Sequence, residues 1–205
     1  MLVPELRGHP PSGGSCVTYG LLEAGDVAAL LHEASRRGAD TGRVGVDGAS
    51  MGALVALRLA ALHRGVTALW LQAPFADLAQ TAARYLARST GLSPALLSVP
   101  ARAAVCLVGA SLGVPPSAVD PIAAAREVSV PSFVVIGEED VFVPAASAAE
   151  VAAALAGEAS LWRVPRAGHA HHPDEPQVVA RRAYVARWTE FFSRHLPPAE
   201  RRGRA

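Results

Sequence analysis

The chain contains no lysine and no asparagine, and it has only two cysteines. Without lysine, no side chain can form the Schiff base by which some enzymes activate a carbonyl substrate. Without asparagine, no side-chain amide of that residue can line an oxyanion site. Cys16 and Cys106 stand far apart in the sequence, which excludes a disulfide-dense scaffold and a four-cysteine zinc site. We expect both cysteines to be free thiols in a reducing cytoplasm.

The chain also has almost no net charge and no long apolar run. The 19 basic residues, all of them arginine, face 18 acidic ones, so the formal net charge is +1. A nucleic-acid binder would usually present a basic face. No charged segment followed by an apolar one marks a secretory signal, and the apolar run 103–114 is shorter than the roughly 20 residues of a membrane span. We therefore expect a cytoplasmic protein that binds neither nucleic acid nor a membrane.

Hydrophobic residues are abundant and make up 51% of the 205 positions. A chain of this length and composition can bury a full core and usually forms one domain. We see no internal repeat and no linker long enough to divide it. We expect a single domain over residues 1–196, followed by a basic tail at 197–205 that is frayed.

Strand-like and helix-like patterns alternate along the chain. Short apolar and β-branched runs predict strands at 2–4, 43–47, 66–71, 132–136 and 159–164. Apolar residues at three- and four-residue steps predict helices at 21–37, 51–63, 76–88, 144–155 and 178–195. Tyr85 falls on the apolar side of the helix at 76–88. Prolines divide 91–130 into what we expect to be short helices, which pack on the sheet or form a small cover over a site. This order predicts an α/β fold in which helices flank both faces of a mostly parallel sheet, a three-layer αβα arrangement.

The most specific local motif is Gly-Ala-Ser-Met-Gly at positions 48–52. It follows one predicted strand and opens a predicted helix, which is the setting of the Gly-x-Ser-x-Gly nucleophile elbow. In such a turn Ser50 adopts a strained backbone, and the small residues Gly48 and Gly52 prevent collision between strand and helix. The hydroxyl then projects above the carboxyl edge of the sheet, beside a helix N-terminus whose free N–H groups favour an anion. The setting favours a nucleophilic serine over a glycine-rich turn that holds a serine by chance.

A serine hydroxyl becomes a good nucleophile only with a base that a carboxylate orients. Asp140 follows the predicted strand 132–136 in a tight turn, and His169 follows the strand 159–164. Both therefore lie at the carboxyl edge with Ser50, in the chain order serine, acid, histidine. The alternatives that stay open are Glu138, Glu139 and Asp77 for the acid, and His171 and His172 for the base.

Cofactor motifs are weak or missing. The segment 169–174 is rich in histidine, but the His-x-His-x-Asp-His spacing of metal sites would need an aspartate where Pro173 stands. We see no Gly-x-Gly-x-x-Gly dinucleotide motif and no Walker phosphate loop. We therefore expect neither a catalytic metal nor an organic cofactor.

Taken together, these motifs resemble the α/β-hydrolase family, in particular its bacterial esterase and serine-peptidase-like members. The resemblance covers nearly all of residues 1–196. Weaker matches lie at Arg7-Gly8-His9, Thr18-Tyr19-Gly20, Ala73-Pro74-Phe75 and Asp120-Pro121-Ile122.

The resemblance implies a serine hydrolase that acts through an acyl-serine intermediate. In it Ser50 is the nucleophile, His169 the general base and acid, and Asp140 the residue that orients the imidazole. The backbone N–H of Met51 would be one oxyanion donor. The expected substrate is a small-molecule or peptide acyl compound, namely a carboxylic ester, a thioester or an amide.

The resemblance begins at the family's fourth strand, so we expect an N-terminally truncated version of the fold. The first three strands, and the loop that normally supplies a second oxyanion N–H, have no counterpart in the sequence. Residues 2–5 would then pair directly with 43–47, or else leave a sheet edge exposed that favours self-association. A non-catalytic α/β-hydrolase-like fragment therefore stays open beside the active enzyme.

Overall fold

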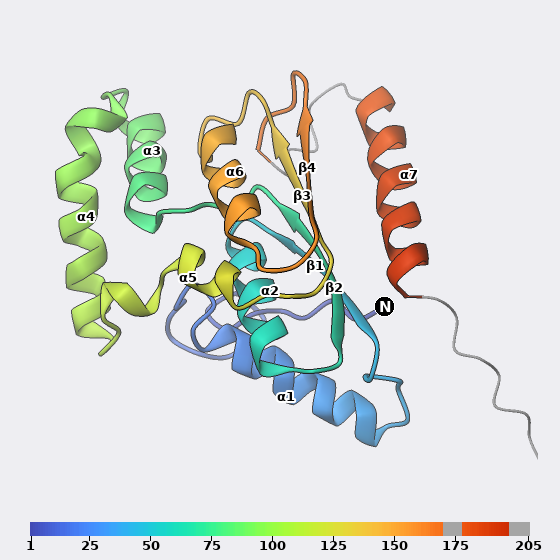
Figure 1. Ribbon diagram of the computed structural model, residues 1–205. Helices are drawn as coiled ribbons and strands as arrows, with labels where there is room; N and C mark the ends of the chain where they lie inside the picture. The colour runs from blue at the N-terminus through green and yellow to red at the C-terminus, as the bar shows by residue number, and fades with distance from the viewer. Residues whose placement is uncertain (170–177, 197–205) are drawn as a thin grey trace, which may run out of the picture.

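A parallel sheet of four strands forms the centre of the molecule in the computed structural model, which describes residues 1–169 and 178–196 (Figure 1). In their spatial order the strands are β1 (Val44–Ala49), β2 (Val66–Gln72), β3 (Ser132–Gly137) and β4 (Ala159–Val164). Each neighbouring pair is parallel, so helices connect the strands by crossovers. The predicted α/β fold with a parallel sheet is confirmed. The predicted tail at 197–205 lies outside the described residues.

Helices flank the sheet and connect its strands. Within the described residues they are α1 (Glu23–Arg36), α2 (Met51–Leu62), α3 (Leu78–Thr90), α4 (Pro94–Ser111), α5 (Pro121–Arg126), α6 (Ala145–Ala154), α7 (Val178–His195) and a short 3-10 helix, η1 (Pro116–Ala118). Five of the α-helices lie close to their predicted ranges. The prediction fails between β2 and β3, where α4 is a single long helix.

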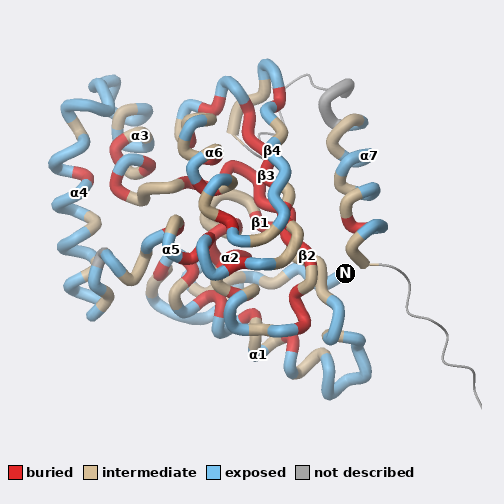
Figure 2. The backbone as a smooth tube through the Cα atoms, viewed as in Figure 1, coloured by how far each residue is buried: buried red, intermediate tan, exposed pale blue. Residues whose placement is uncertain are grey.

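The larger core lies on the face of the sheet that α2, α5 and α6 cover, with α1 packed outside α2. Alternate residues of a strand point to opposite faces. In β2, Leu69 and Leu71 face this core, whereas Trp70 faces the other side. All three are fully buried. Figure 2 shows the buried positions concentrated in β2, β3 and α2, so β3, which leads into the Asp140 turn, is the most firmly held of the strands that carry the site loops.

The helix α7 packs on the opposite face, to the right of the sheet in Figure 1. The Trp70 Nε1–H donates a hydrogen bond to the Tyr184 hydroxyl at 2.5 Å, which ties β2 to this helix. At β1 the approach is so close that a Cβ on Gly45 would lie 2.5 Å from the Phe192 ring. A glycine at this position therefore lets α7 lie directly on the sheet.

The strand β1 lies at one edge of the sheet and, among the described residues, pairs with β2 alone. The strand predicted at 2–4 is wrong, because residues 1–6 form none. Pro4 has no backbone N–H to donate to a ladder, and the neighbouring Leu2 and Val3 are exposed. Of the two expected arrangements, the structure has the exposed edge.

The helix α4 differs most from its prediction. Pro94 occupies the first turn, where its missing N–H is not needed, and Ser93 caps the turn by accepting from the Leu96 N–H at 3.4 Å. The helix then continues through Pro100 instead of ending there. It packs beside α3 and away from the sheet (Figure 1), so that only Ala101 is buried. The prolines do not divide this segment, and the segment does not cover the sheet.

The length and composition of α4 would also suit a membrane-spanning helix. Its mean hydropathy is 1.4, and 6% of it is buried. Length and composition alone do not establish a membrane span, because the buried core helices of other proteins and signal sequences share them. The expectation that the protein binds no membrane stays a prediction.

Candidate active site

Ser50 stands in the sharp turn between β1 and α2. Its backbone angles are φ 51° and ψ −114°, a conformation that non-glycine residues rarely adopt and that stores strain. The Ser50 N–H donates to the Gln72 carbonyl oxygen at 2.8 Å, which fixes the turn to β2. The side chain does not cap α2. The hydroxyl is therefore not used to satisfy the first turn of the helix.

The two glycines of the motif have different roles. A Cβ on Gly48 would lie 2.2 Å from the carbonyl oxygen of Gly52, which no L-residue could accommodate without a backbone shift. A Cβ on Gly52 would meet nothing within 4 Å. The expected collision is confirmed for Gly48, whereas at Gly52 a Cβ alone would meet no neighbouring atom.

Asp140 and His169 are in direct contact. The Asp140 Oδ2 lies 2.7 Å from the His169 Nδ1, and the Asp140 side chain is fully buried. The other oxygen, Oδ1, accepts the backbone N–H groups of Phe142 at 2.9 Å and Val143 at 2.8 Å. These bonds fix the carboxylate in one orientation. With Nδ1 donating to the carboxylate, the Nε2 of His169 is the ring nitrogen left to act as a base.

Backbone contacts hold the Asp140 turn against the loop that carries His169. The Glu139 N–H donates to the Ala167 carbonyl oxygen at 2.8 Å, across the carboxyl ends of β3 and β4. A Cβ on Gly137 would lie 2.2 Å from that same oxygen. Only glycine permits this approach, so the distance between the acid and the histidine is set by the backbone.

Tyr85 of α3 lies beside this pair. Its ring stacks on Phe142 at a centroid distance of 4.1 Å and stands edge-on to the His169 ring at 6.5 Å. Burial raises the pKa of the Tyr85 phenol and the nearby Asp140 carboxylate raises it further, while Ser50 lowers it only in part. Tyr85 is thus a neutral phenol that borders His169.

The sequence did not identify Tyr85 as a site residue. Its place on the apolar side of a helix predicts packing, and its ring does pack on Phe142. The one available signal is its hydroxyl, a polar group on an otherwise apolar helix face directly after a strand of the sheet.

The alternative acids and bases are placed elsewhere or lie outside the described residues. Glu138 and Glu139 are exposed. Asp77 caps α3 by accepting from the Gln80 N–H at 3.0 Å, and it pairs with Arg102 at 3.2 Å. His171 and His172 lie outside the described residues.

The N-terminus of α2 offers one candidate oxyanion donor. Met51 is the first residue of this helix, where backbone N–H groups have no partner within the helix.

Residues 1–169 and 178–196 hold no group of three or more His, Cys, Asp or Glu arranged for a metal ion. Both Cys16 and Cys106 are free, as expected.

An apolar cavity of about 190 Å³ lies between α3 and α4. Leu86 lines it from α3, Val108 from α4, Leu112 from the end of that helix, and Tyr19 from the N-terminal segment. The cavity is next to the site rather than in it: its wall includes Leu86, the chain neighbour of Tyr85, but not Ser50. The α3–α4 pair therefore borders a hollow, while a cover over Ser50 stays a prediction.

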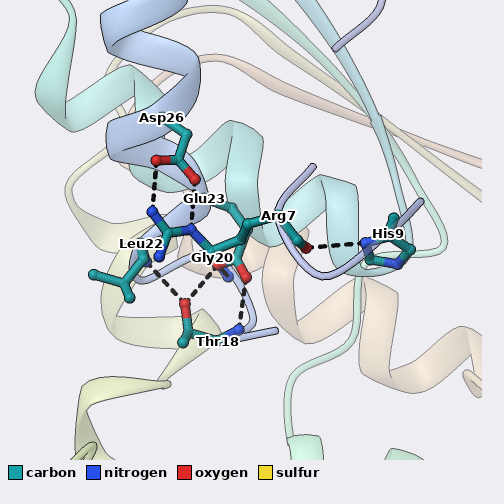
Figure 3. Close-up of polar contacts among 7 residues, drawn as sticks. All are labelled: Arg7, His9, Thr18, Gly20, Leu22, Glu23 and Asp26. Carbon is teal, nitrogen blue, oxygen red and sulfur yellow. Dashed lines mark hydrogen bonds and ion pairs between the residues drawn. The ribbon is translucent and has the colours of Figure 1, made fainter. Parts of the chain in front are cut away.

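A buried carboxylate fixes the turn that carries Tyr19 (Figure 3). Glu23 accepts hydrogen bonds from the Thr18 N–H at 2.6 Å, the Thr18 hydroxyl at 2.7 Å and the Gly20 N–H at 2.8 Å. Burial opposes ionisation of Glu23, but the hydrogen bonds from Thr18 and Gly20 outweigh it and lower the pKa. Between these bonds Tyr19 is held at φ 50°, with its ring edge-on to Phe75 at 6.5 Å.

The Arg7-Gly8-His9 segment anchors the chain instead of lining the site. Arg7 donates to Asp26 of α1 through Nε at 2.5 Å and Nη2 at 2.6 Å (Figure 3). This bond lowers the pKa of Asp26. His9 is exposed, and its Nδ1 lies 3.1 Å from the Arg7 carbonyl oxygen.

Comparison with known proteins agrees with this architecture. The model of the alpha/beta hydrolase family matches residues 1–182. No curated protein matches the chain closely enough to be called a relative. Among solved structures, the chain is similar to the Pyrococcus furiosus esterase Pf2001, with 24% identity and a TM-score of 0.69 over 93% of this chain and 69% of that one.

Two further structures are similar at lower identity. A thermophilic esterase from Thermogutta terrifontis has 20% identity and a TM-score of 0.60, over 91% of this chain and 78% of that one. Rv0554 from Mycobacterium tuberculosis has 23% identity and a TM-score of 0.55, over 84% and 72%. At these identities the structural similarity establishes the shared fold.

Proposed function

Since the chain belongs to the alpha/beta hydrolase family, we propose that it is a serine hydrolase. It cleaves a carboxylic ester, a thioester or an amide through an acyl-serine intermediate. The observation that carries the proposal is the 2.7 Å contact between Asp140 and His169, at the carboxyl edge of the sheet where the strained Ser50 elbow also lies. Ser50, Asp140 and His169 are the three groups that such chemistry needs.

In the proposed reaction the Ser50 Oγ attacks the carbonyl carbon of the substrate. The Nε2 of His169 takes the hydroxyl proton, and the buried Asp140 carboxylate stabilises the imidazolium through Nδ1. The negative charge that develops on the carbonyl oxygen faces the Met51 N–H at the start of α2. The intermediate collapses as His169 returns the proton to the leaving alcohol, thiol or amine. Water, deprotonated by His169, then hydrolyses the acyl-serine.

The cavity between α3 and α4 supports an acyl substrate, either a small molecule or a peptide. Its wall is apolar, and it includes Leu86, which follows Tyr85 in α3. An apolar hollow of this kind suits the hydrocarbon part of an acyl group, because burying that surface is favourable. We propose that this part of the substrate lies there.

A fluorophosphonate probe tests the reactive serine. We expect it to label the wild-type protein and not Ser50→Ala, with Ser98→Ala as the control, because Ser98 is an exposed serine of α4. Circular dichroism shows whether each variant is folded. Equal labelling of wild type and Ser50→Ala would contradict the proposal.

The alternative is that the chain has the α/β-hydrolase fold but does not turn over a substrate. The observation that favours it is the edge position of β1, the strand that leads into Ser50, which leaves one flank of the elbow without a neighbouring strand among the described residues. A folded wild-type protein that the probe does not label would support this alternative. Labelling at Ser50 without steady-state turnover would show a serine that acylates but is not regenerated.

A further inference from the structure

Gln72 is a polar side chain buried at the carboxyl end of an inner strand of the sheet. It is the last residue of β2 and is 7% exposed. It lies opposite Ala49, the last residue of β1, and its carbonyl oxygen accepts the Ser50 N–H at 2.8 Å. The next residue, Ala73, has a positive φ of 43°, so the regular strand ends there. Gln72 therefore closes the β1–β2 ladder at the point where the nucleophile elbow begins.

The side chain of Gln72 makes a second connection to β1. Its Nε2–H donates to the Asp47 Oδ1 at 2.8 Å. Because a carboxylate only accepts hydrogen bonds, the amide nitrogen is the Gln72 atom that faces it. The other oxygen, Oδ2, accepts the Trp188 Nε1–H of α7 at 3.0 Å. Both carboxylate oxygens are thus engaged, and Asp47 links β2 to α7.

The helix end of this series of hydrogen bonds is itself firmly packed. The Trp188 ring stands edge-on to the Phe192 ring at a centroid distance of 4.8 Å. Phe192 is buried and lies so close to β1 that a Cβ on Gly45 would be 2.5 Å from its ring. A continuous set of contacts therefore runs from α7, across the ends of β1 and β2, to the turn that carries the serine.

The Ser50 turn needs such support because its backbone is strained. At φ 51° this conformation persists only where the surrounding structure holds it. The Ser50 N–H is tied to the Gln72 carbonyl, and the side-chain bond to Asp47 restrains the backbone from which that carbonyl projects. Loss of the restraint would let the Ser50 hydroxyl move relative to His169, and a misplacement of about 1 Å can slow a reaction about 100-fold.

We propose that Gln72 is a positioning residue, which holds the Ser50 turn in its reactive geometry through the hydrogen bond to Asp47. It acts through the backbone of the turn, and no proton leaves it during the reaction. The inference rests on the proposed function, because it explains how the nucleophile of that reaction is kept in place. It also gives α7 a part in the reaction beyond covering the sheet.

The variant Gln72→Glu breaks the bond with little change in shape, because at neutral pH a carboxylate then faces the Asp47 carboxylate with no hydrogen between them. We expect the rate constant of acylation by p-nitrophenyl acetate to fall about 10- to 100-fold. KM should change less than about threefold, since substrate binding is not altered. Stopped-flow measurement of the p-nitrophenolate burst gives the rate. The matched control is Gln80→Glu, the same substitution at an exposed position of α3, which should leave the rate unchanged.

A second substitution reverses the direction of the bond and separates positioning from a general loss of stability. In Gln72→Glu combined with Asp47→Asn, the amide nitrogen introduced at position 47 donates to the carboxylate introduced at position 72, while the amide oxygen still accepts from Trp188. We expect the double variant to recover acylation to within about threefold of the wild-type rate. Asp47→Asn alone should be slower than the double variant, because its single oxygen then serves two donors.

The outcomes separate this inference from the proposed function. A Gln72→Glu protein that is folded by circular dichroism and acylates at the wild-type rate would overturn the positioning role alone, as would a double variant as slow as Gln72→Glu. If Gln72→Glu does not fold, Trp188→Phe decides, since it removes a donor to Asp47 and keeps an aromatic ring. We expect it to slow acylation about three- to tenfold, and an unchanged rate would overturn the inference. A wild type that gives no burst would overturn the serine hydrolase and the positioning role together.

Discussion

The loops at the carboxyl edge of the sheet and the α3–α4 pair border the same site, but different contacts hold them. Backbone contacts fix the loops. The Ser50 N–H bonds to β2, the Glu139 N–H bonds to the neighbouring loop, and Gly48 and Gly137 approach carbonyl groups too closely to carry a side chain. The loops therefore have little freedom to shift.

The α3–α4 pair depends on side chains. Among the described elements, α4 packs on α3 and η1, and the Arg102–Asp77 ion pair adds a contact at its surface. Most of α4 is exposed, as Figure 2 shows by its pale blue colour. The difference suggests a division of roles: the loops fix reaction geometry, and the helix pair provides an adaptable apolar surface. Changes in the loops should then affect kcat or folding, and changes in the helix pair should affect KM.

The largest effect is expected from Asp140→Asn. The amide cannot stabilise the His169 imidazolium, so kcat should fall roughly 10³- to 10⁴-fold in steady-state kinetics with a p-nitrophenyl ester. The fold should survive, because the amide oxygen can still accept the N–H groups of Phe142 and Val143. Asp77→Asn is the matched control, since Asp77 caps a helix. A kcat within threefold of wild type in Asp140→Asn would contradict the role of the buried pair.

The two glycines of the elbow give the next largest effect. In Gly48→Ala the new Cβ would collide with the Gly52 carbonyl, so the free energy of unfolding should fall by about 3 kcal/mol or more. In Gly52→Ala the Cβ meets open space, and stability should change by less than about 1 kcal/mol, with a gain from the better helix propensity of alanine. Urea unfolding followed by circular dichroism measures both. Equal losses in the two variants would mean that the tight approach at Gly48 is not what shapes the turn.

Glu23 fixes the turn that carries Tyr19 of the cavity wall, and its substitution should have an intermediate effect. At neutral pH, Glu23→Gln should lose about 1–3 kcal/mol, since a buried group then lacks its charge-assisted hydrogen bonds. The folded state lowers the pKa of Glu23, so the stability it contributes is complete above the unfolded pKa, about 4.3. This contribution is lost as the pH falls through the lower folded pKa. The difference in unfolding free energy between wild type and variant should therefore shrink below about pH 4, and a constant difference would exclude the charge as its origin.

The smallest effect is expected at the cavity. Leu86→Ala removes apolar wall from the hollow between α3 and α4, so KM for longer acyl esters should rise a few-fold, by about 1 kcal/mol of binding. Turnover of an acetyl ester should not change. The control is Leu107→Ala, on an exposed position of α4 that does not line the cavity. If Leu107→Ala raised KM as much, α4 would act as a general apolar surface instead of a binding wall.

The sequence predicted the parts of the fold that local patterns encode. The strands β2, β3 and β4 are short apolar runs, and the turns after β3 and β4 carry Asp140 and His169. Because parallel strands end at a common edge, the proximity of these two residues followed from topology, and the 2.7 Å contact agrees with it.

Other parts depended on contacts that a single sequence does not display. Whether Pro100 ends a helix depends on the packing of α4 along α3, which offsets the lost hydrogen bond. Tyr85 lies beside His169 only because α3 follows the carboxyl end of β2. Residues 2–4 have a strand-like composition but pair with no strand among the described residues. In each case the outcome was decided by tertiary contacts and not by local propensity.

The central claim is that Ser50 becomes acylated by a base that Asp140 orients. Rapid quenching of the folded protein with p-nitrophenyl acetate, followed by peptide mass spectrometry, tests it most directly. The account predicts a burst of p-nitrophenolate close to one equivalent and an acetyl group on the peptide that contains Ser50, both absent in His169→Ala. No burst, or an acetyl group that persists elsewhere in Ser50→Ala, would contradict it.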